Sequence, residues 1–170
     1  MAEPTTNCFK CIKNGACELQ AMAREYGIDV RNFKSSHGDV QQEPFDAHPF
    51  LSYDPGLCIQ CQRCISTCAK ATGRHALSLE RNGARVYVKV PFGEGWENSL
   101  CESCGNCAQA CPTGALTIKR RKDYREWEVK KVRTTCPHCA TGCQMDLYVK
   151  DGKIVDVQGA DGPSNHNLLC

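Results

Sequence analysis

The sequence has little of the apolar material that a self-sufficient core needs. Hydrophobic residues make up 41% of its 170 residues, but this fraction counts 15 cysteines. Without those 15 of 170 residues, roughly 32% remains, which is low for a globular domain. Aromatic residues contribute only 7%. We therefore expect metal clusters to form part of the core, and the metal-free protein to be largely unfolded.

Strong charge and targeting signals are also missing. The formal net charge is +2, which gives no strong case for binding nucleic acid or membrane lipid. No apolar signal region or twin-arginine stretch lies near the amino terminus, and no run of 18 apolar residues occurs. We expect a soluble, cytoplasmic protein without a membrane span, where thiols stay reduced and disulfides are rare. The one basic run, 119–122, fits a solvated linker or a docking site for an acidic redox partner.

Cysteine, in contrast, is abundant and regularly spaced. The four sets are Cys8, Cys11 and Cys17; Cys58, Cys61, Cys64 and Cys68; Cys101, Cys104, Cys107 and Cys111; and Cys136, Cys139, Cys143 and Cys170. Thiols this dense indicate metal binding, and the spacing of the two middle sets indicates iron–sulfur clusters. The odd total argues against a pure disulfide framework. The chain is therefore expected to transfer electrons.

The two middle sets share the spacing C-x2-C-x2-C-x3-C, and Pro112 follows the second of them. Over residues 51–119 the chain closely resembles the bacterial 2×4Fe–4S ferredoxin domain, in which the fourth cysteine of each motif ligates the other cluster. The resemblance implies one cluster on Cys58, Cys61, Cys64 and Cys111, and a second on Cys101, Cys104, Cys107 and Cys68. The first motif departs from the pattern, because Ala69 stands where the second has Pro112. Zinc is the alternative metal.

The last set follows a different pattern, with Cys136, Cys139 and Cys143 close together and Cys170 distant. The stretch 135–143, together with 149–155, resembles the amino-terminal cluster domain of molybdenum or tungsten bis-pterin oxidoreductases, the formate dehydrogenase group in particular. That resemblance implies a 4Fe–4S cluster on these four thiols. Zinc is again the alternative, since the spacing is less diagnostic.

The first set resembles the amino-terminal cluster motif of formate dehydrogenase α subunits, NADH dehydrogenase large subunits and iron-only hydrogenases. Those families read H-x3-C-x2-C-x5-C with the histidine as fourth ligand, but Pro4 occupies that position here. The cluster on Cys8, Cys11 and Cys17 is thus of 3Fe type, or completed by Asn7, Glu3, water or another chain, or absent. Zinc and cluster-free thiols are the other interpretations.

We expect an α+β fold built from modules in series. These are a small cluster-binding helical element over residues 1–33, a linker over 34–56, a bacterial two-cluster ferredoxin-like domain over 57–119, and a small antiparallel β 4Fe–4S domain over 129–170. A helix is predicted after Cys17 and ends before Gly27, a hairpin is predicted around 82–83, and a second hairpin turns at 151–152. His37 and His48 are expected to face solvent, with a ligand role as the alternative, and His138 to be an ordinary loop residue.

The order of the modules resembles one family throughout, the NAD(P)- or ferredoxin-linked formate dehydrogenase α subunit. The chain resembles iron-only hydrogenases in its first two modules only. It resembles NADH dehydrogenase large subunits in its first and last modules, but those subunits, as a rule, lack the complete ferredoxin pair. The resemblance covers essentially the whole chain but only a fraction of that family's length. Its 2Fe–2S domain and its pterin-binding domains are not in this sequence.

We therefore predict an electron-transfer module, a subunit or a fragment, of a formate dehydrogenase-like complex. It would hold three 4Fe–4S clusters, and a fourth if Cys8, Cys11 and Cys17 bind one. The implied partners are a pterin-containing catalytic subunit and a flavin, NAD or ferredoxin-type electron partner, and no catalytic residue is expected in this chain. The alternatives are a free polyferredoxin carrier, the electron-input subunit of a hydrogenase or NADH dehydrogenase-like complex, and a zinc-stabilised scaffold without redox function.

Overall fold

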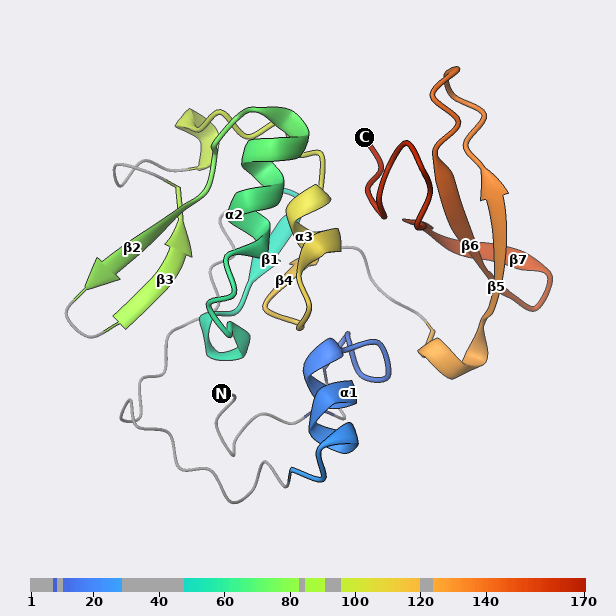
Figure 1. Cartoon of the computed structure of the whole chain (residues 1–170), viewed down its shortest axis with the longest axis horizontal. Coiled ribbons are helices and arrows are strands. Elements are labelled where there is room, and N and C mark those ends of the chain that lie inside the picture. Colours follow the sequence, from blue (N-terminus) through green and yellow to red (C-terminus); the bar gives the residue numbers. More distant parts are fainter. Residues whose placement is uncertain (1–7, 9–10, 29–47, 83–84, 91–95, 120–123) are drawn as a thin grey trace. The chain divides into compact units, whose positions relative to one another are not determined.

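A computed structural model describes residues 8, 11–28, 48–82, 85–90, 96–119 and 124–170. The chain divides into two compact units, Met1–Arg120 and Arg121–Cys170, each of which contains short helices or strands joined by loops (Figure 1). The helices are short and the sheets small and antiparallel, as expected for ferredoxin-like iron–sulfur domains. No helix in the described part of the chain is both long and apolar enough to cross a membrane.

In its described residues, the first unit contains three short α-helices and two two-stranded sheets. In chain order these are α1 (Glu18–Glu25), β1 (Leu51–Tyr53), α2 (Arg63–Thr67), β2 (Ser78–Asn82), β3 (Arg85–Lys89), α3 (Asn106–Ala110) and β4 (Leu116–Ile118). Strand β1 pairs with β4, β2 pairs with β3, and α2 packs against α3. The β2–β3 pairing confirms the predicted hairpin, although residues 83 and 84 of its turn lie outside the described residues.

The core of this unit contains few buried apolar side chains and includes cysteine thiols. Its buried members are Leu51, Tyr53, Leu77, Val88, Val90, Trp96, Cys107, Ala108, Ala115 and Leu116. Half-buried cysteines pack against them from both middle sets, namely Cys58, Cys64, Cys68, Cys101 and Cys111. The cysteine sulfurs thus complete a core that the apolar side chains alone leave small, as the composition predicts.

The two cysteine motifs repeat one backbone conformation. Gln60 and Ser103, each two residues after the first cysteine of its motif, have φ of +56° and +58°. Gln62 and Gly105, two positions further on, have φ of +62° and +75° and precede α2 and α3 as their N-cap residues. Left-handed backbone is costly for residues with a Cβ, so its recurrence at equivalent positions shows that both loops take the same path.

The two halves differ where each motif ends. Helix α2 continues through Cys68 into a π-helical turn, Cys68–Thr72, before Gly73 ends it in the left-handed region. Helix α3 instead stops at Ala110, and Cys111 has an extended backbone before Pro112. Proline has no N–H and disfavours helix in the residue before it, whereas Ala69 permits the helix to continue. The Ala69/Pro112 difference seen in the sequence therefore has a structural counterpart.

Strand β1 lies within the segment 34–56 that was predicted to be a linker. Leu51, Ser52 and Tyr53 pair in register with Ile118, Thr117 and Leu116. The carboxyl end of this segment therefore contains a strand that the sequence did not predict, because three residues among prolines carry no strand signal until their distant partner is known. Residues 29–47, the rest of the linker, lie outside the described residues.

Helix α1 confirms the helix predicted after Cys17 and ends as expected at Gly27. Gly27 has φ of +62°, and the backbone N–H groups of Gly27 and Ile28 donate to Arg24 and Ala23, which is the Schellman pattern. The start of α1 contacts the ferredoxin-like part, since Glu18 N donates to the Pro112 carbonyl at 3.0 Å. The Glu18 carboxylate also accepts two hydrogen bonds of 2.8 Å from Arg63.

The second unit is a three-stranded antiparallel sheet in the order β5–β6–β7, formed by Lys130–Thr135, Gln144–Lys150 and Lys153–Gly159. Asp151 and Gly152, with φ of +51° and +75°, form the tight turn between β6 and β7, as the sequence predicts. Tyr124 and Tyr148 are buried beside the sheet, and the Tyr124 hydroxyl donates to Asp156 at 2.6 Å.

The contact between Cys11 and Gly114 gives a test of how α1 and its loop pack. A Cβ added at Gly114 would lie 2.6 Å from the Cys11 sulfur, so Gly114→Ala should displace Cys11 and lower the free energy of unfolding by about 1–3 kcal/mol, as overpacking does. Gly56→Ala is the control, because its added Cβ meets only the Asp54 carboxylate, at 3.2 Å. Denaturant unfolding of the anaerobic holoprotein measures both, and equal stability of the two variants would contradict this packing.

Candidate metal centres

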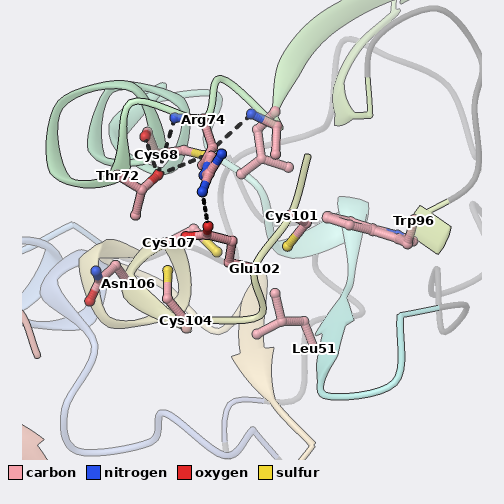
Figure 2. Close-up of a pocket in the computed structure, with 13 residues that line it drawn as sticks. Leu51, Cys68, Thr72, Arg74, Trp96, Cys101, Glu102, Cys104, Asn106 and Cys107 are labelled. Carbon is pink, nitrogen blue, oxygen red and sulfur yellow. Dashed lines mark hydrogen bonds and ion pairs between the residues drawn. The ribbon is translucent and has the colours of Figure 1, made fainter. Parts of the chain in front are cut away.

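Four cysteines from the two middle sets line one pocket. Cys68 comes from the π-helical turn, Cys101 and Cys104 from the loop before α3, and Cys107 from α3 itself. Figure 2 shows these four thiols around the pocket together with Leu51 and Trp96. The structure therefore brings together the four residues that the ferredoxin resemblance assigns to one cluster, including Cys68 from the other motif.

Burial and mutual repulsion disfavour free thiolates in this pocket. Burial raises the pKa of Cys107 to about 12, and the neighbouring thiols Cys104, Cys64 and Cys101 raise it further. The pKa of Cys101 is also raised, first by burial and then by Cys104 and Cys68. Thiols in this state become thiolates when cationic iron replaces their protons, so cluster binding releases protons and supports folding.

Cys111 and the first three cysteines of the first motif lie near one another. The pKa of Cys64 is raised to about 12 by burial and by the nearby thiols Cys111, Cys58 and Cys61. The Gln60 N–H donates to Cys58 at 3.4 Å, as Ser103 N–H donates to Cys101 at 3.4 Å in the second half. Backbone donors of this kind favour the negative charge of a ligated sulfur. Cys111 thus lies with the first motif, the reverse of Cys68.

A threonine hydroxyl lies near each of the two cysteines, Cys68 and Cys111, that lie with the opposite motif. Thr113 Oγ1 lies 3.7 Å from the Cys111 sulfur and donates to the Leu57 carbonyl at 2.9 Å. Thr72 Oγ1 lies 4.0 Å from the Cys68 sulfur and donates to the Cys68 carbonyl at 2.7 Å. Thr113 thus ties the segment after Cys111 to Leu57, and Thr72 ties its turn to the backbone of Cys68. The two motifs nevertheless end in different conformations.

His48 corrects one prediction, because it does not face solvent. Its side chain is 2% exposed and packs edge-on against Trp96, with ring centroids 4.7 Å apart. Its Nε2 lies 3.6 Å from the Cys101 sulfur. Burial, with the nearby charge of Lys119, lowers the pKa of His48. This contact could not be predicted from the sequence, because 53 residues separate the two side chains. His37 lies outside the described residues, and His138 is exposed as expected.

The first cysteine set forms a loose group at the start of α1. Cys11 N donates to the Cys8 carbonyl at 3.2 Å, and Cys17 is the N-cap of α1, as predicted. The pKa of Cys11 is raised by burial, and the thiols of Cys17 and Cys8 raise it too. Glu3, Pro4 and Asn7, which bear on the fourth ligand, lie outside the described residues.

The last set is more exposed than the others. Cys139 and Cys170 are exposed, while Cys136 and Cys143 are half-buried and joined by a backbone hydrogen bond of 2.8 Å. Cys139 Sγ lies 3.2 Å from Thr141 Oγ1, and hydrogen bonds from the side chain and backbone of Thr141 to the thiolate lower the pKa of Cys139. The first three of these residues lie around the loop between β5 and β6, and the fourth lies at the end of the chain.

Asn165 holds the segment that carries Cys170 against the sheet. It is buried, and its Nδ2 donates to the carbonyls of Gln144, Ala160 and Leu168 at 2.9–3.1 Å. Its Oδ1 accepts from Gln144 N at 2.9 Å. The sequence offered no signal for this role, since asparagine in a polar loop is usually exposed.

The donor set of the two middle groups fits iron–sulfur clusters. Among the described residues, no three His, Cys, Asp or Glu side chains are arranged to hold one metal ion. A 4Fe–4S cubane instead takes one thiolate per iron, so its ligands surround the cluster and need not converge on a point. Cys58, Cys61, Cys64 and Cys111 would hold one such cluster, and Cys68, Cys101, Cys104 and Cys107 another. A bound cluster would supply one-electron oxidation and reduction.

Three family models match the chain in succession. Residues 2–31 match the NADH-ubiquinone oxidoreductase-G iron–sulfur binding region, residues 48–117 the ferredoxin-like domain of NADH-quinone oxidoreductase subunit 3, and residues 129–170 the molybdopterin oxidoreductase Fe4S4 domain. The chain is thus built from Fe4S4 domains of the molybdopterin oxidoreductase and NADH-quinone oxidoreductase G type. It binds multiple 4Fe–4S clusters and is an iron–sulfur electron-transfer module.

The similar proteins come from several different enzymes. The G 2 subunit of the NADH-quinone oxidoreductase of Rhizobium meliloti is 34% identical over 174 residues, which cover 100% of this chain and 20% of the relative. NADPH-Fe(3+) oxidoreductase subunit alpha of Geobacter sulfurreducens is 32% identical over 168 residues, which cover 96% of this chain and 19% of the relative. A Staphylococcus haemolyticus protein provisionally named a formate dehydrogenase is 27% identical over 210 residues, which cover 96% of this chain and 20% of the relative.

A solved structure shares the fold as well. An NAD+-reducing [NiFe]-hydrogenase in its H2-reduced state gives a TM-score of 0.58 and 29% identity, covering 68% of this chain and 48% of that one. The chain spans only about a fifth of the curated relatives' length. Because the ferredoxin-like part matches an NADH-quinone oxidoreductase model, the order of modules does not separate formate dehydrogenases from NADH-quinone oxidoreductases, contrary to the prediction.

Asn165 gives a test of the last site. Asn165→Ala removes four hydrogen bonds and takes a donor from the carbonyls of Ala160 and Leu168, so it should cost about 1–3 kcal/mol of unfolding free energy and loosen the segment that ends in Cys170. Ser164→Ala, at an exposed neighbouring position, is the control. We expect the Asn165 variant alone to lose iron from one cluster, measured as iron per chain. Unchanged stability and iron would show that Asn165 does not position this segment.

The crossed arrangement of the middle sets can be tested by pairing substitutions. If Cys64 and Cys111 ligate the same cluster, the Cys64→Ala/Cys111→Ala variant should lose or convert one cluster, or at most about four iron. The Cys107→Ala/Cys111→Ala variant should affect two clusters, or about eight iron. Iron and sulfide analysis with EPR counts the clusters. The opposite pattern would mean that each motif keeps its own fourth cysteine.

Proposed function

We propose that this chain relays single electrons within an oxidoreductase complex, between a partner redox subunit and a catalytic cofactor that another part of the complex holds. The observation that carries the proposal is the pocket lined by Cys68, Cys101, Cys104 and Cys107, in which a cysteine of the first motif joins three of the second. Nothing in the described residues joins an acid–base pair to a defined substrate pocket. The chain's own contribution is therefore to hold clusters at fixed spacing and to control their charge.

The contacts of the first unit support an order for the relay. Cys11 lies against Gly114, and Glu18 N donates to the carbonyl of Pro112, so the first cysteine set lies near Cys111. Cys64, from the Cys111 group, is in turn close enough to Cys107 to raise its pKa. Electrons would thus pass from the first cysteine set to the cluster on Cys58, Cys61, Cys64 and Cys111. From there they would pass to the cluster on Cys68, Cys101, Cys104 and Cys107, or the reverse.

The finer proposal is that the complex is formate dehydrogenase-like, with a pterin-containing catalytic subunit and a flavin, NAD or ferredoxin-type partner. The molybdopterin oxidoreductase match over residues 129–170 and the staphylococcal relative support it. The Rhizobium relative favours an NADH-quinone oxidoreductase instead, because it matches the whole chain at higher identity. Either complex would give the chain the same electron-transfer role with a different substrate.

Metal analysis tests the general proposal. Anaerobically purified protein should contain about 12 iron and 12 acid-labile sulfide per chain if three cubanes are present, or about 16 of each with a fourth. EPR signals of reduced clusters should appear with dithionite. A colourless protein with zinc and no iron would replace the proposal with the zinc scaffold. Copurification with a pterin-containing subunit would then favour the formate dehydrogenase-like complex, and a purified complex without pterin would count against it.

A further inference from the structure

His48 occupies a position that its hydrogen bonds define completely. Its Nδ1 accepts from the backbone N–H groups of Phe50 and Leu51, at 3.0 and 2.9 Å. An imidazole nitrogen that accepts hydrogen bonds must carry a lone pair, so in the neutral ring the proton resides on Nε2. The burial of the ring and the nearby charge of Lys119 both disfavour the doubly protonated form. The backbone ahead of β1 therefore fixes the tautomer.

The protonated nitrogen is directed at a cysteine sulfur. His48 Nε2 lies 3.6 Å from Cys101 Sγ, and Cys101 belongs to the group with Cys68, Cys104 and Cys107. The edge-on contact of the ring with Trp96 limits its rotation, as does a second edge-on contact with Phe50 at 6.2 Å. The imidazole therefore has one orientation, and it presents an N–H to the sulfur.

An N–H directed at a cluster sulfur changes what the cluster can do. Reduction adds negative charge that spreads over the thiolate ligands, and a hydrogen bond to one of them stabilises the reduced form. The effect is strong where water is excluded, because a buried hydrogen bond is weakly screened. Hydrogen bonds to the sulfurs are among the factors that set the potentials of iron–sulfur clusters.

We propose that His48 is a positioning and tuning residue for the cluster on Cys68, Cys101, Cys104 and Cys107, through an Nε2–H···S hydrogen bond to Cys101 that keeps this cluster easier to reduce. The inference rests on the proposed function, since it requires a cluster at this site. It adds a residue that lies outside every cysteine motif.

Spectroscopy of the wild-type chain tests the contact without any substitution. Protein labelled with 15N only at histidine should show a 15N hyperfine coupling to the reduced cluster in pulsed EPR. His48→Asn should remove the share of this coupling that comes from His48 and leave any share from His138, because asparagine can still accept from the backbone of Phe50 and Leu51 but is too short to reach the sulfur. A wild-type spectrum without histidine coupling, in protein with full iron and sulfide, overturns the inference and leaves the proposed function standing.

Redox titration tests the tuning. His48→Asn should shift the midpoint potential of one cluster to a more negative value, and His48→Gln, which can place an N–H near the position of Nε2, should restore part of the shift. Ser52→Ala is the matched control, because it changes the middle residue of β1 and leaves His48 and its contacts in place; the potential and the histidine coupling should survive it. Equal potentials in wild type and His48→Asn, at equal iron content, would overturn the tuning role.

Discussion

The rest of the first unit depends on the exchange of cysteines between its two halves. Helices α2 and α3 are five residues each, too short to be stable alone, and the core between them contains few large apolar side chains. Each helix leads to a cysteine, Cys68 or Cys111, that lies with the opposite motif. Metal ligation across this pair would do what apolar packing does in a larger domain, and would fix the distance between the two clusters in the same step.

The sequence predicted the chemistry better than the boundaries. Cysteine spacing reveals which thiols group together, because a short loop between ligands limits their reach. The exchange of Cys68 and Cys111 was available only through the ferredoxin resemblance, and the structure brings the same groups together. Local signals also sufficed for the end of α1 at Gly27 and for the turn at Asp151–Gly152, since both require left-handed backbone.

What the sequence could not predict depends on contacts between distant residues. Strand β1 exists because residues 51–53 pair with β4, Leu116–Ile118, far along the chain, and nothing in three residues announces that partner. His48 was expected at the surface because a histidine among prolines and polar residues usually lies there. It became a neighbour of Cys101 only through the pairing of β1, which also carries Tyr53 to the vicinity of Cys58. One short strand thus brings a polar side chain to each of the two cysteine groups.

The unequal exposure of the cysteines has a consequence for handling in air. Cys107 is buried between α3 and the core, whereas Cys139 and Cys170 are open to solvent. Oxidants attack accessible thiolates first, and the lowered pKa of Cys139 increases its thiolate fraction. In protein that has lost its clusters, oxidation should therefore begin at Cys139, Cys170 and the likewise exposed Cys61 and reach the buried Cys107 last, so that a partly oxidised sample could rebuild the cluster around Cys107 after the carboxyl-terminal set had lost that ability.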